Sequence, residues 1–285
     1  MLRRALLNAV PELGILANCC ATPFADVASQ TELAPRGARG ACATGGQVGS
    51  LEATRSDVVD ANRILAHEGI LDAFGHVSVR HPDRPDRFLL SRARAPELVH
   101  DSDLLEFDLS GEPVDNKGPT PYIERYIHAA VYAVREDVSS VCHNHAPAIL
   151  PFSVSMTPLS GVIHAARFLG ADVPVWDLAR EFPGEWSPLV RNLEYGDSLA
   201  ECLGAGSIAL MRGHGSVVVG NDPQEVVSRC ISMDKNARVQ EIAIRLGDYT
   251  RLHEGEYESR SSAASFGRAS DNRAWEYFCR RAGLL

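Results

Sequence analysis

The sequence contains no long apolar run and no basic cluster, and each absence excludes a class of protein. No stretch approaches the roughly 18 apolar residues that a membrane-spanning helix needs, so we expect a soluble protein with no membrane partner. The 28 Lys and Arg residues against 37 Asp and Glu residues give a formal charge of 28 − 37 = −9. Because no basic stripe offsets this charge, nucleic acid is not expected as a partner.

Motifs for bound nucleotides and for thiolate chemistry are absent as well. The chain has no Gly-x-Gly-x-x-Gly sequence and no Walker-type loop, which removes a nucleotide as the first candidate ligand. Its seven cysteines are odd in number and show no Cys-x-x-Cys spacing, so neither a zinc knuckle nor a redox motif is indicated. We therefore expect reduced thiols and a cytoplasmic location.

The composition, 45% hydrophobic and 23% charged over 285 residues, is that of an ordinary globular protein. Residues 1–50 are expected to form a poorly ordered N-terminal extension, because a short apolar opening leads into an Ala-, Gly- and Thr-rich stretch. A signal or transit peptide is poorly supported there, and a start codon placed too early would leave the same pattern. Residues 51–250 are expected to form the folded domain. Residues 251–285 are expected to form a tail with a flexible connection at Ser259–Ser270 and a short helix at Asn272–Arg281.

Apolar periodicity predicts a mixture of helices and strands. Helices are expected from Ser56 to the glycine at position 69, over Tyr122–Val134, and from the capping sequence at Asp222 to about Leu246. Short strands are expected at Val77–Arg80, Phe88–Leu90, Leu104–Asp108, Ile208–Met211 and Val217–Val219. This pattern indicates an α/β protein in which helices cover a sheet.

Three histidines in two short motifs suggest a metal site. His143 and His145 lie in Val-Cys-His-Asn-His-Ala-Pro, where an extended strand would project both imidazoles to the same face. His214 lies in Arg-Gly-His-Gly, and the flanking glycines allow the backbone to approach a ligand closely. The alternative for the His-x-His pair is two solvated imidazoles on an exposed strand.

Glu124 is the leading candidate for a further ligand. The sequence Pro-Thr-Pro before it predicts a helix start with Thr120 as the cap and Pro121 at the first helical position. This start would place the Glu124 carboxylate one helix away from the histidine pair. The alternative is a surface glutamate that stabilises the helix dipole.

The order of these motifs resembles that of the class II aldolase/adducin family. The resemblance covers about residues 54–250 and depends on Phe-Gly-His-Val-Ser-Val-Arg at 74–80, Glu124 with His128, His-Asn-His-Ala at 143–146 and Gly-His-Gly at 213–215. It implies a three-layer α/β/α domain with a central, mainly antiparallel sheet. It also implies a homotetramer with active sites at subunit boundaries.

Carried over to this chain, the resemblance makes His143, His145 and His214 the ligands of one divalent metal ion per subunit. Glu124 would lie beside them as a further ligand or as the catalytic acid or base. Family aldolases use the ion as a Lewis acid when a carbon–carbon bond is cleaved. Mn²⁺, Zn²⁺, Fe²⁺ and Co²⁺ all suit this set of ligands.

Two positions depart from the sugar-phosphate aldolases of the family, whose Gly-Asn pair and Thr-Ser-Gly loop hold phosphate. This chain has Gly75-His76 and then Leu90-Ser91-Arg92, and a guanidinium is suited to bidentate capture of a carboxylate. His76, Ser91 and Arg92 are therefore predicted to bind a small-molecule carboxylate substrate. A solvated surface position is the alternative for Arg92, with Arg94 on the same face of an extended segment.

The departure resembles the branch of the family that decarboxylates hydroxylated aromatic or heteroaromatic acids. Its implied activity is that of a carbon–carbon lyase acting on a compound such as 3-hydroxy-2-methylpyridine-4,5-dicarboxylate or a dihydroxyphthalate. The alternative enzyme is an aldolase or epimerase that acts on a small hydroxy acid or sugar derivative through an enediolate. A third possibility is a non-catalytic interaction module, as in adducin, against which the intact histidines and Glu124 argue.

Overall fold

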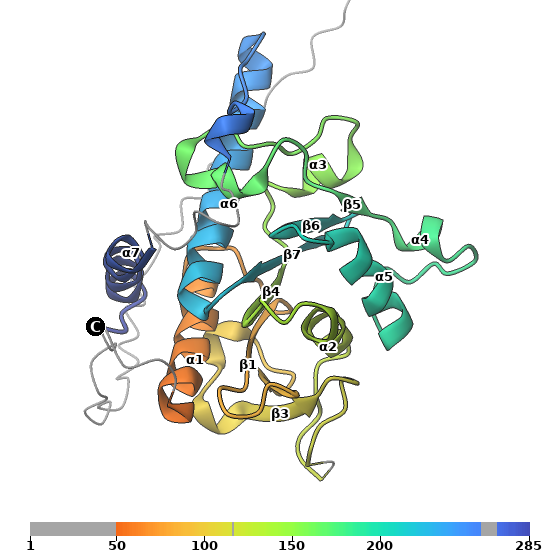
Figure 1. Cartoon of the computed structure of the whole chain (residues 1–285), viewed down its shortest axis with the longest axis vertical. Coiled ribbons are helices and arrows are strands. Elements are labelled where there is room, and N and C mark those ends of the chain that lie inside the picture. The colour runs from red at the N-terminus through yellow and green to blue at the C-terminus, as the bar shows by residue number, and fades with distance from the viewer. Residues whose placement is uncertain (1–49, 116, 258–266) are drawn as a thin grey trace, which may run out of the picture. The chain divides into compact units, whose positions relative to one another are not determined.

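A seven-stranded sheet forms the centre of the protein, which is described by a computed structural model (Figure 1). The strand order is β3-β2-β1-β4-β7-β6-β5, and every neighbouring pair is antiparallel except β5 and β6. The expected mainly antiparallel sheet is therefore confirmed. The strands are β1 (His76–Arg80), β2 (Arg87–Ser91), β3 (Leu104–Asp108), β4 (Ser140–Asn144), β5 (Val175–Trp176), β6 (Ile208–Met211) and β7 (Gly215–Gly220).

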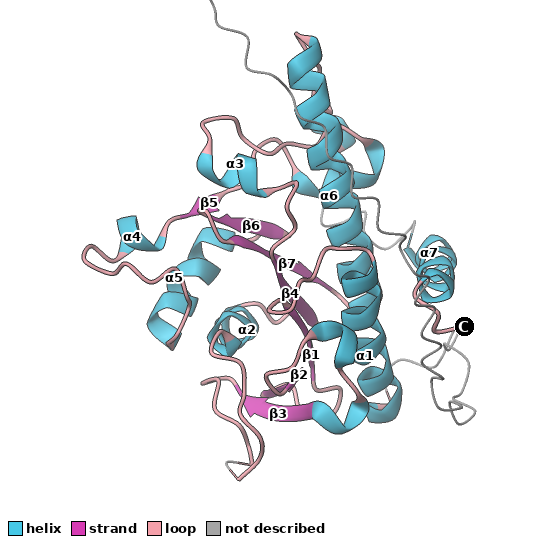
Figure 2. Cartoon of the chain, turned by 180° about the vertical axis from the view of Figure 1, so that it is seen from behind, coloured by secondary structure: helices cyan, strands magenta, loops and turns pink. Residues whose placement is uncertain are grey.

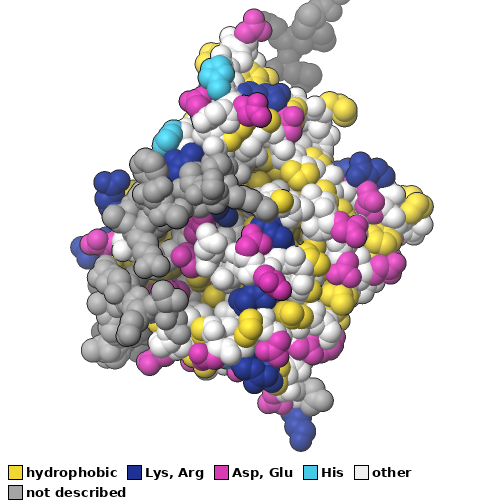
Figure 3. All heavy atoms as spheres, viewed as in Figure 1, with side chains coloured by type: hydrophobic (Ala, Val, Ile, Leu, Met, Phe, Trp, Pro, Cys, Tyr) yellow, Lys and Arg dark blue, Asp and Glu magenta, His cyan; other side chains and the backbone are white. Residues whose placement is uncertain are grey.

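The structure describes residues 50–115, 117–257 and 267–285. The predicted N-terminal extension lies outside these residues except for its last position, and most of the predicted connection at 259–270 also lies outside them. Among the described helices, none has the combination of length and apolar character that crossing a bilayer requires. On the face drawn in Figure 3, acidic and basic side chains are intermixed and do not form a patch of one sign.

Helices α1, α4, α5 and α6 begin at residues whose side chains cap them. Ser50 accepts a hydrogen bond from the Ala53 N–H, so the first helix begins five residues before the predicted start. Asp222 caps the long helix that was predicted to start there. The α-helices are α1 (Leu51–His67), α2 (Arg125–Val134), α3 (Leu150–Val154), α4 (Leu178–Glu181), α5 (Leu193–Leu203), α6 (Pro223–Leu246) and α7 (Gly267–Arg281). Segments of 3-10 helix lie at Pro96–Leu98, Asp101–Asp103, His164–Leu169 and Glu254–Glu256.

Helices cover both faces of the sheet, which confirms the expected α/β/α layers (Figures 1 and 2). Alternation along each strand divides the side chains between the two faces. In β1, Val77 and Val79 pack into the core formed with α1 and α6, whereas His76 and Ser78 contact α2 on the other face. The second core lies between the sheet and α2 with α5. Helix α7 packs on α1 and α6 and buries Trp275 and Cys279 there.

The predicted start of the helix at α2 is wrong. The Thr120 carbonyl accepts the Ala93 N–H, and Pro121 forms a β-bridge with Arg92, so this segment is extended and pairs with the chain that follows β2. Pairing with a distant segment overrides the local capping sequence. The helix begins at Arg125 and leaves Glu124 at the N-cap position, where its side chain does not cap the helix.

Candidate metal centre

Four side chains from three parts of the fold meet at one point. Glu124, His143, His145 and His214 each offer a ligand atom, and these atoms all lie within 4.8 Å of one another. His143 lies in β4, His145 directly follows that strand, and His214 lies in the turn between β6 and β7. The Nε2 atoms of His143 and His145 are 3.0 Å apart, so the predicted projection of this pair to one place is confirmed.

The glycines beside His214 have the close-approach role that the sequence suggested. Gly213 has a φ of +64°, a conformation that glycine adopts without steric cost and that turns the chain between the two strands. A Cβ atom at Gly215 would overlap the carbonyl oxygen of Asn144 and lie 2.9 Å from Cδ2 of His145. The turn therefore reaches the histidine pair only because position 215 has no side chain.

The Nδ1 atom of each of these three histidines faces an oxygen that can only accept a hydrogen bond. The oxygens are the Ser216 carbonyl for His143 at 3.1 Å, the Asp72 carboxylate for His145 at 3.0 Å and the Pro188 carbonyl for His214 at 3.1 Å. A neutral ring thus carries its hydrogen on Nδ1, which leaves the Nε2 lone pair directed at the cluster. Lone pairs held this close repel one another unless a cation lies between them.

The carboxylate of Glu124 completes the cluster. Its Oε1 atom accepts the Val190 N–H at 3.0 Å, and its Oε2 atom lies 3.4 Å from Nε2 of His143 and 3.7 Å from Nε2 of His214. Burial disfavours the charged form, but His143, His214 and the Val190 N–H together lower the pKa of Glu124 to about 2. The group is therefore a carboxylate at neutral pH.

His145 and His214 are suited to remain neutral beside it. Burial, followed by the neighbouring His143, lowers the pKa of His214 to about 4. The same two causes lower the pKa of His145, although Asp72 opposes them. A neutral imidazole has a free lone pair, and three imidazoles with one carboxylate form a donor set that fits a first-row divalent cation.

The predicted substrate residue His76 lies next to this cluster, and Tyr122 links Ser91 to His76. His76 pairs across the sheet with His143, and their ring centroids are 5.4 Å apart. On its other side the His76 ring lies 4.3 Å from the ring of Tyr122, whose hydroxyl is 3.4 Å from Oγ of Ser91. Burial and the surrounding histidines, His128 first, lower the pKa of His76 well below its usual value.

Arg92 is partly exposed and forms an ion pair with a buried carboxylate. Its Nε atom is 2.7 Å from Oδ1 of Asp103, a residue that is only 3% exposed, and Arg94 pairs with the same carboxylate. This pair holds Arg92 in place and occupies part of its guanidinium. Its role toward a substrate stays a prediction.

Sequence reasoning missed Asp72, Tyr122 and the segment between α4 and α5. Asp72 has a local signal, since its side chain accepts the N–H groups of Phe74 and Gly75 in an Asx-type turn before the Gly-His motif. The segment that carries Pro188 and Val190 has no periodic pattern. Nothing in its sequence indicates that its backbone would orient His214 and Glu124.

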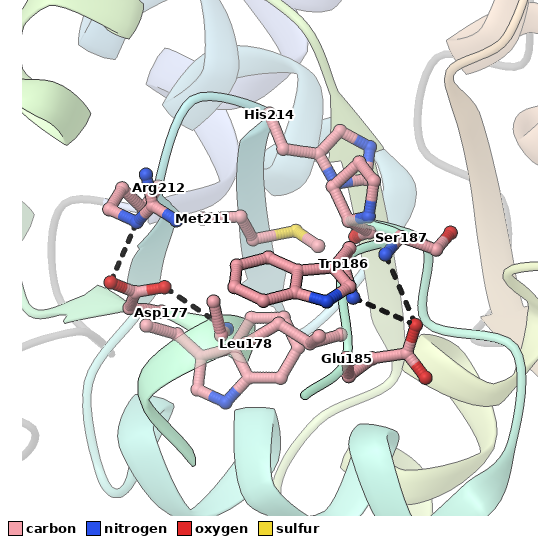
Figure 4. Close-up of a pocket in the computed structure, with 11 residues that line it drawn as sticks. Asp177, Leu178, Glu185, Trp186, Ser187, Met211, Arg212 and His214 are labelled. Atoms are coloured by element: carbon pink, nitrogen blue, oxygen red, sulfur yellow. Dashed lines mark hydrogen bonds and ion pairs between the residues drawn. The ribbon is translucent and has the colours of Figure 1, made fainter. Parts of the chain in front are cut away.

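A cavity of about 50 Å³ adjoins the cluster at His214. Figure 4 shows His214 and Arg212 at opposite sides of it, with Met211 and Trp186 between them. Trp186 is 85% exposed, and the Nε atom of Arg212 pairs with Asp177 at 2.7 Å. The candidate metal centre thus adjoins a pocket that Trp186 helps to line.

Comparison with known proteins identifies the family model that this chain matches. Residues 56–241 match the Class II Aldolase and Adducin N-terminal domain. The chain is 40% identical over 195 residues to the decarboxylase tropJ of Talaromyces stipitatus, a match that covers 64% of this chain and 73% of that protein. It is 30% identical over 205 residues to the 3,4-dihydroxyphthalate decarboxylase of a Terrabacter species, which covers 67% of this chain and 81% of that protein.

Solved structures share the fold. An aldolase II superfamily protein from Pseudomonas syringae superimposes with a TM-score of 0.68 at 20% identity, over 84% of this chain and 95% of that one. At this level of identity the likeness concerns the fold alone. It agrees with the layered architecture described above.

Proposed function

The chain belongs to the class II aldolase and adducin family, and from this premise we propose that it is a metal-dependent decarboxylase of a hydroxylated aromatic or pyridine dicarboxylate. The family and the decarboxylase relatives support an enzyme of the decarboxylase or aldolase type. The observation that carries the proposal is the cluster of three histidines whose Nδ1 atoms are all held by acceptors. The 3,4-dihydroxyphthalate decarboxylases supply the substrate class.

One divalent ion would be held by Nε2 of His143, His145 and His214, with Oε2 of Glu124 beside it. When bound, such an ion supplies a Lewis acid that stabilises negative charge on oxygen. Mn²⁺, Zn²⁺, Fe²⁺ and Co²⁺ all remain candidates, because imidazole and carboxylate ligands suit each of them.

The low pKa of Glu124 defines its proposed part in the reaction. A carboxylate with a pKa of about 2 cannot begin as an acid at neutral pH, but it can accept the proton of a ring hydroxyl. It would then return that proton to the ring carbon from which the carboxylate departs. The carbon–carbon bond breaks to give carbon dioxide, its electron pair stays with the ring, and the product leaves as the phenolate.

His76, Ser91 and Arg92 are proposed to hold the carboxylate that is not lost. They lie on strands β1 and β2 and on the segment that follows, and Tyr122 is in contact with both His76 and Ser91. Binding one carboxylate at these residues would place the other at the metal centre. This arrangement would decide which of two carboxylates leaves.

The test is to incubate Mn²⁺-loaded protein with 3,4-dihydroxyphthalate and with 3-hydroxy-2-methylpyridine-4,5-dicarboxylate and to measure carbon dioxide. Release from either compound, and none after the metal is removed by a chelator, is the expected result. Sugar phosphates are assayed in parallel for aldehyde release. Aldehyde without carbon dioxide would identify an aldolase and contradict the proposal.

A further inference from the structure

A buried chain of four side chains leads from His76 into the layer between the sheet and α2. The His76 Nδ1 atom is 2.7 Å from Nε2 of His128, whose Nδ1 atom is 2.6 Å from Oγ of Ser78. That Oγ atom is in turn 2.7 Å from the hydroxyl of Tyr132. None of the four residues is more than 1% exposed. A donor in the enclosed part of such a chain needs an acceptor within the protein, whereas a donor at an end that borders a site can bind a ligand or solvent.

The hydrogens of this chain can run in two directions, and Tyr132 decides between them. The Oγ atom of Ser78 is the acceptor that the described part of the chain provides for the Tyr132 O–H. If Ser78 donated to Tyr132, the tyrosine hydrogen would be buried without an acceptor, which costs about 1–3 kcal/mol. Tyr132 therefore donates to Ser78, and Ser78 donates to His128.

The direction fixes the tautomers of both histidines. Because the His128 Nδ1 atom accepts from Ser78, the ring hydrogen of His128 is on Nε2 and is donated to Nδ1 of His76. The ring hydrogen of His76 is then on its own Nε2 atom. No residue in the described part of the chain is a hydrogen-bond partner of that atom, and the ring contacts those of His143 and Tyr122. The Nε2 atom is not among the fully enclosed side-chain atoms that lack a partner, so this end of the chain borders the candidate site.

The ring hydrogen of His76 is thus on the opposite nitrogen from that of the three histidines in the cluster. An acceptor at Nδ1 leaves His143, His145 and His214 with a lone pair at Nε2, whereas a donor at Nδ1 gives His76 an N–H there. A nitrogen that carries a hydrogen cannot ligate a metal, but it can bind an anionic oxygen.

We propose that Tyr132, Ser78 and His128 are positioning residues that hold His76 as a hydrogen-bond donor, and that this donor binds a carboxylate oxygen of the substrate. The identity of the ligand rests on the proposed function. The tautomer of His76 does not, because it follows from the hydrogen bonds of the protein alone.

The tautomer is tested in the full chain loaded with diamagnetic Zn²⁺ and labelled with ¹⁵N-histidine. Long-range ¹H–¹⁵N spectra separate rings protonated at Nε2 from rings protonated at Nδ1, and His76→Gln identifies the His76 signals by their loss. We expect Nε2–H for His76 and His128 in the unsubstituted protein. Finding Nδ1–H at His76 would overturn the proposal whatever reaction the protein catalyses.

Tyr132→Phe removes the group that sets the direction, so the Nδ1–H form of His76 should appear in the same spectra. Tyr126→Phe is the matched control on the same helix, since the Tyr126 hydroxyl contacts Glu112 and Arg125 and not this chain. The control should keep the spectrum of the unsubstituted protein. A Tyr132→Phe spectrum identical to it would contradict the positioning role.

Carboxylate binding is measured by calorimetric titration of the Zn²⁺-loaded protein with phthalate. His76→Phe should weaken phthalate binding about tenfold, His76→Gln should restore most of it because its amide is a donor, and zinc content should stay at one ion per chain. With a compound that the enzyme decarboxylates, the effect of His76→Phe should appear in KM more than in kcat. Unchanged phthalate affinity in His76→Phe would overturn the binding role but leave the proposed reaction standing.

Discussion

Each side chain at the candidate metal centre is oriented by a hydrogen-bond partner outside the cluster. The Asp72 carboxylate, the Ser216 carbonyl and the Pro188 carbonyl orient three imidazoles, and the Val190 N–H orients Glu124. Such outer contacts fix the ligand geometry before any ion arrives, which lowers the cost of binding it. Three predictions belong to this scale.

Changing His143, His145 or His214 to alanine should remove the bound ion and lower turnover by about 100-fold or more, because each change deletes one of three converging lone pairs. Metal content by atomic emission and decarboxylation rates check this. His67→Ala, at the exposed end of α1, is the control and should change neither. Full activity in a metal-free preparation of any of the three variants would refute the assignment.

Asp72→Asn should lower the affinity for Zn²⁺ by roughly tenfold. The amide oxygen still accepts the N–H groups of Phe74 and Gly75, so the turn is kept, while the charge that orients the His145 ring is lost. Competition with a chromogenic chelator measures the affinity. Asp86→Asn on the exposed segment before β2 is the control, and equal affinities in both variants would contradict the role of Asp72.

Arg92→Ala should raise KM for a dicarboxylate about tenfold and change KM for the matching monocarboxylate much less, since a charge-assisted contact to one carboxylate is lost. Steady-state kinetics with both compounds give the comparison. Arg84→Ala removes a surface arginine that pairs with Asp86 and serves as the control. Equal effects of Arg92→Ala on both substrates would remove its proposed role.

Helix ends that depend on local residues were predicted correctly from the sequence, whereas an end set by a distant segment was not. The caps at Asp222 and near Gly69 were recognised because a helix end depends on residues within one turn of it. The start of α2 was misplaced because Pro121 pairs with Arg92, a contact that no local pattern encodes. The error moved Glu124 by a few positions along the helix but left it beside the histidines.

Helix α1 contains a carboxyl group that should make stability depend on pH. Burial, followed by Asp60 and Asp222, raises the pKa of Asp57 to about 7. The unfolded chain has a pKa of about 4, so this group stabilises the fold fully below pH 4 and loses that contribution as pH rises through 7. Asp57→Asn mimics the protonated form and should raise the free energy of unfolding by about 1 kcal/mol at pH 8, a discounted figure because the group is partly exposed.

Urea denaturation at pH 5 and pH 8 checks the prediction for Asp57. The difference between variant and unsubstituted protein should be larger at pH 8 than at pH 5. Asp83→Asn in an exposed turn is the control and should shift stability equally at both values. If Asp57→Asn changed the free energy of unfolding by the same amount at both pH values, Asp57 would have an ordinary pKa in the folded protein.

On the scale of the whole molecule, large apolar side chains are exposed at positions close in sequence to residues of the candidate metal centre or on its adjoining cavity. Phe74 is 72% exposed and follows Asp72 closely in sequence, Ile123 is 57% exposed and precedes Glu124, and Trp186 lines the cavity at His214. Exposed apolar groups around a site are typical of a surface that another chain covers. The homotetramer remains a prediction that these positions support.

Sedimentation equilibrium should give a mass four times the 30.9 kDa of the chain. Phe74→Ser should shift the protein toward smaller species, because it removes an apolar contact expected at the interface. Leu246→Ser, at the exposed end of α6 and far along the chain from the site, is the comparison. A monomer at micromolar concentration in the unsubstituted protein would rule out the tetramer.

The sequence by itself determined which atoms are available for chemistry. Alternation along one strand brings His143 and His145 together, and the glycine at position 215 permits the approach of His214. Both signals can be read from a few consecutive residues. Tertiary structure alone decided what each side chain can do there. The acceptor behind His145, the pairing of Arg92 with Asp103 and the chain from Tyr132 to His76 join residues that lie far apart or follow no periodic pattern. A hydrogen bond depends on positions in space, and only the folded backbone fixes those.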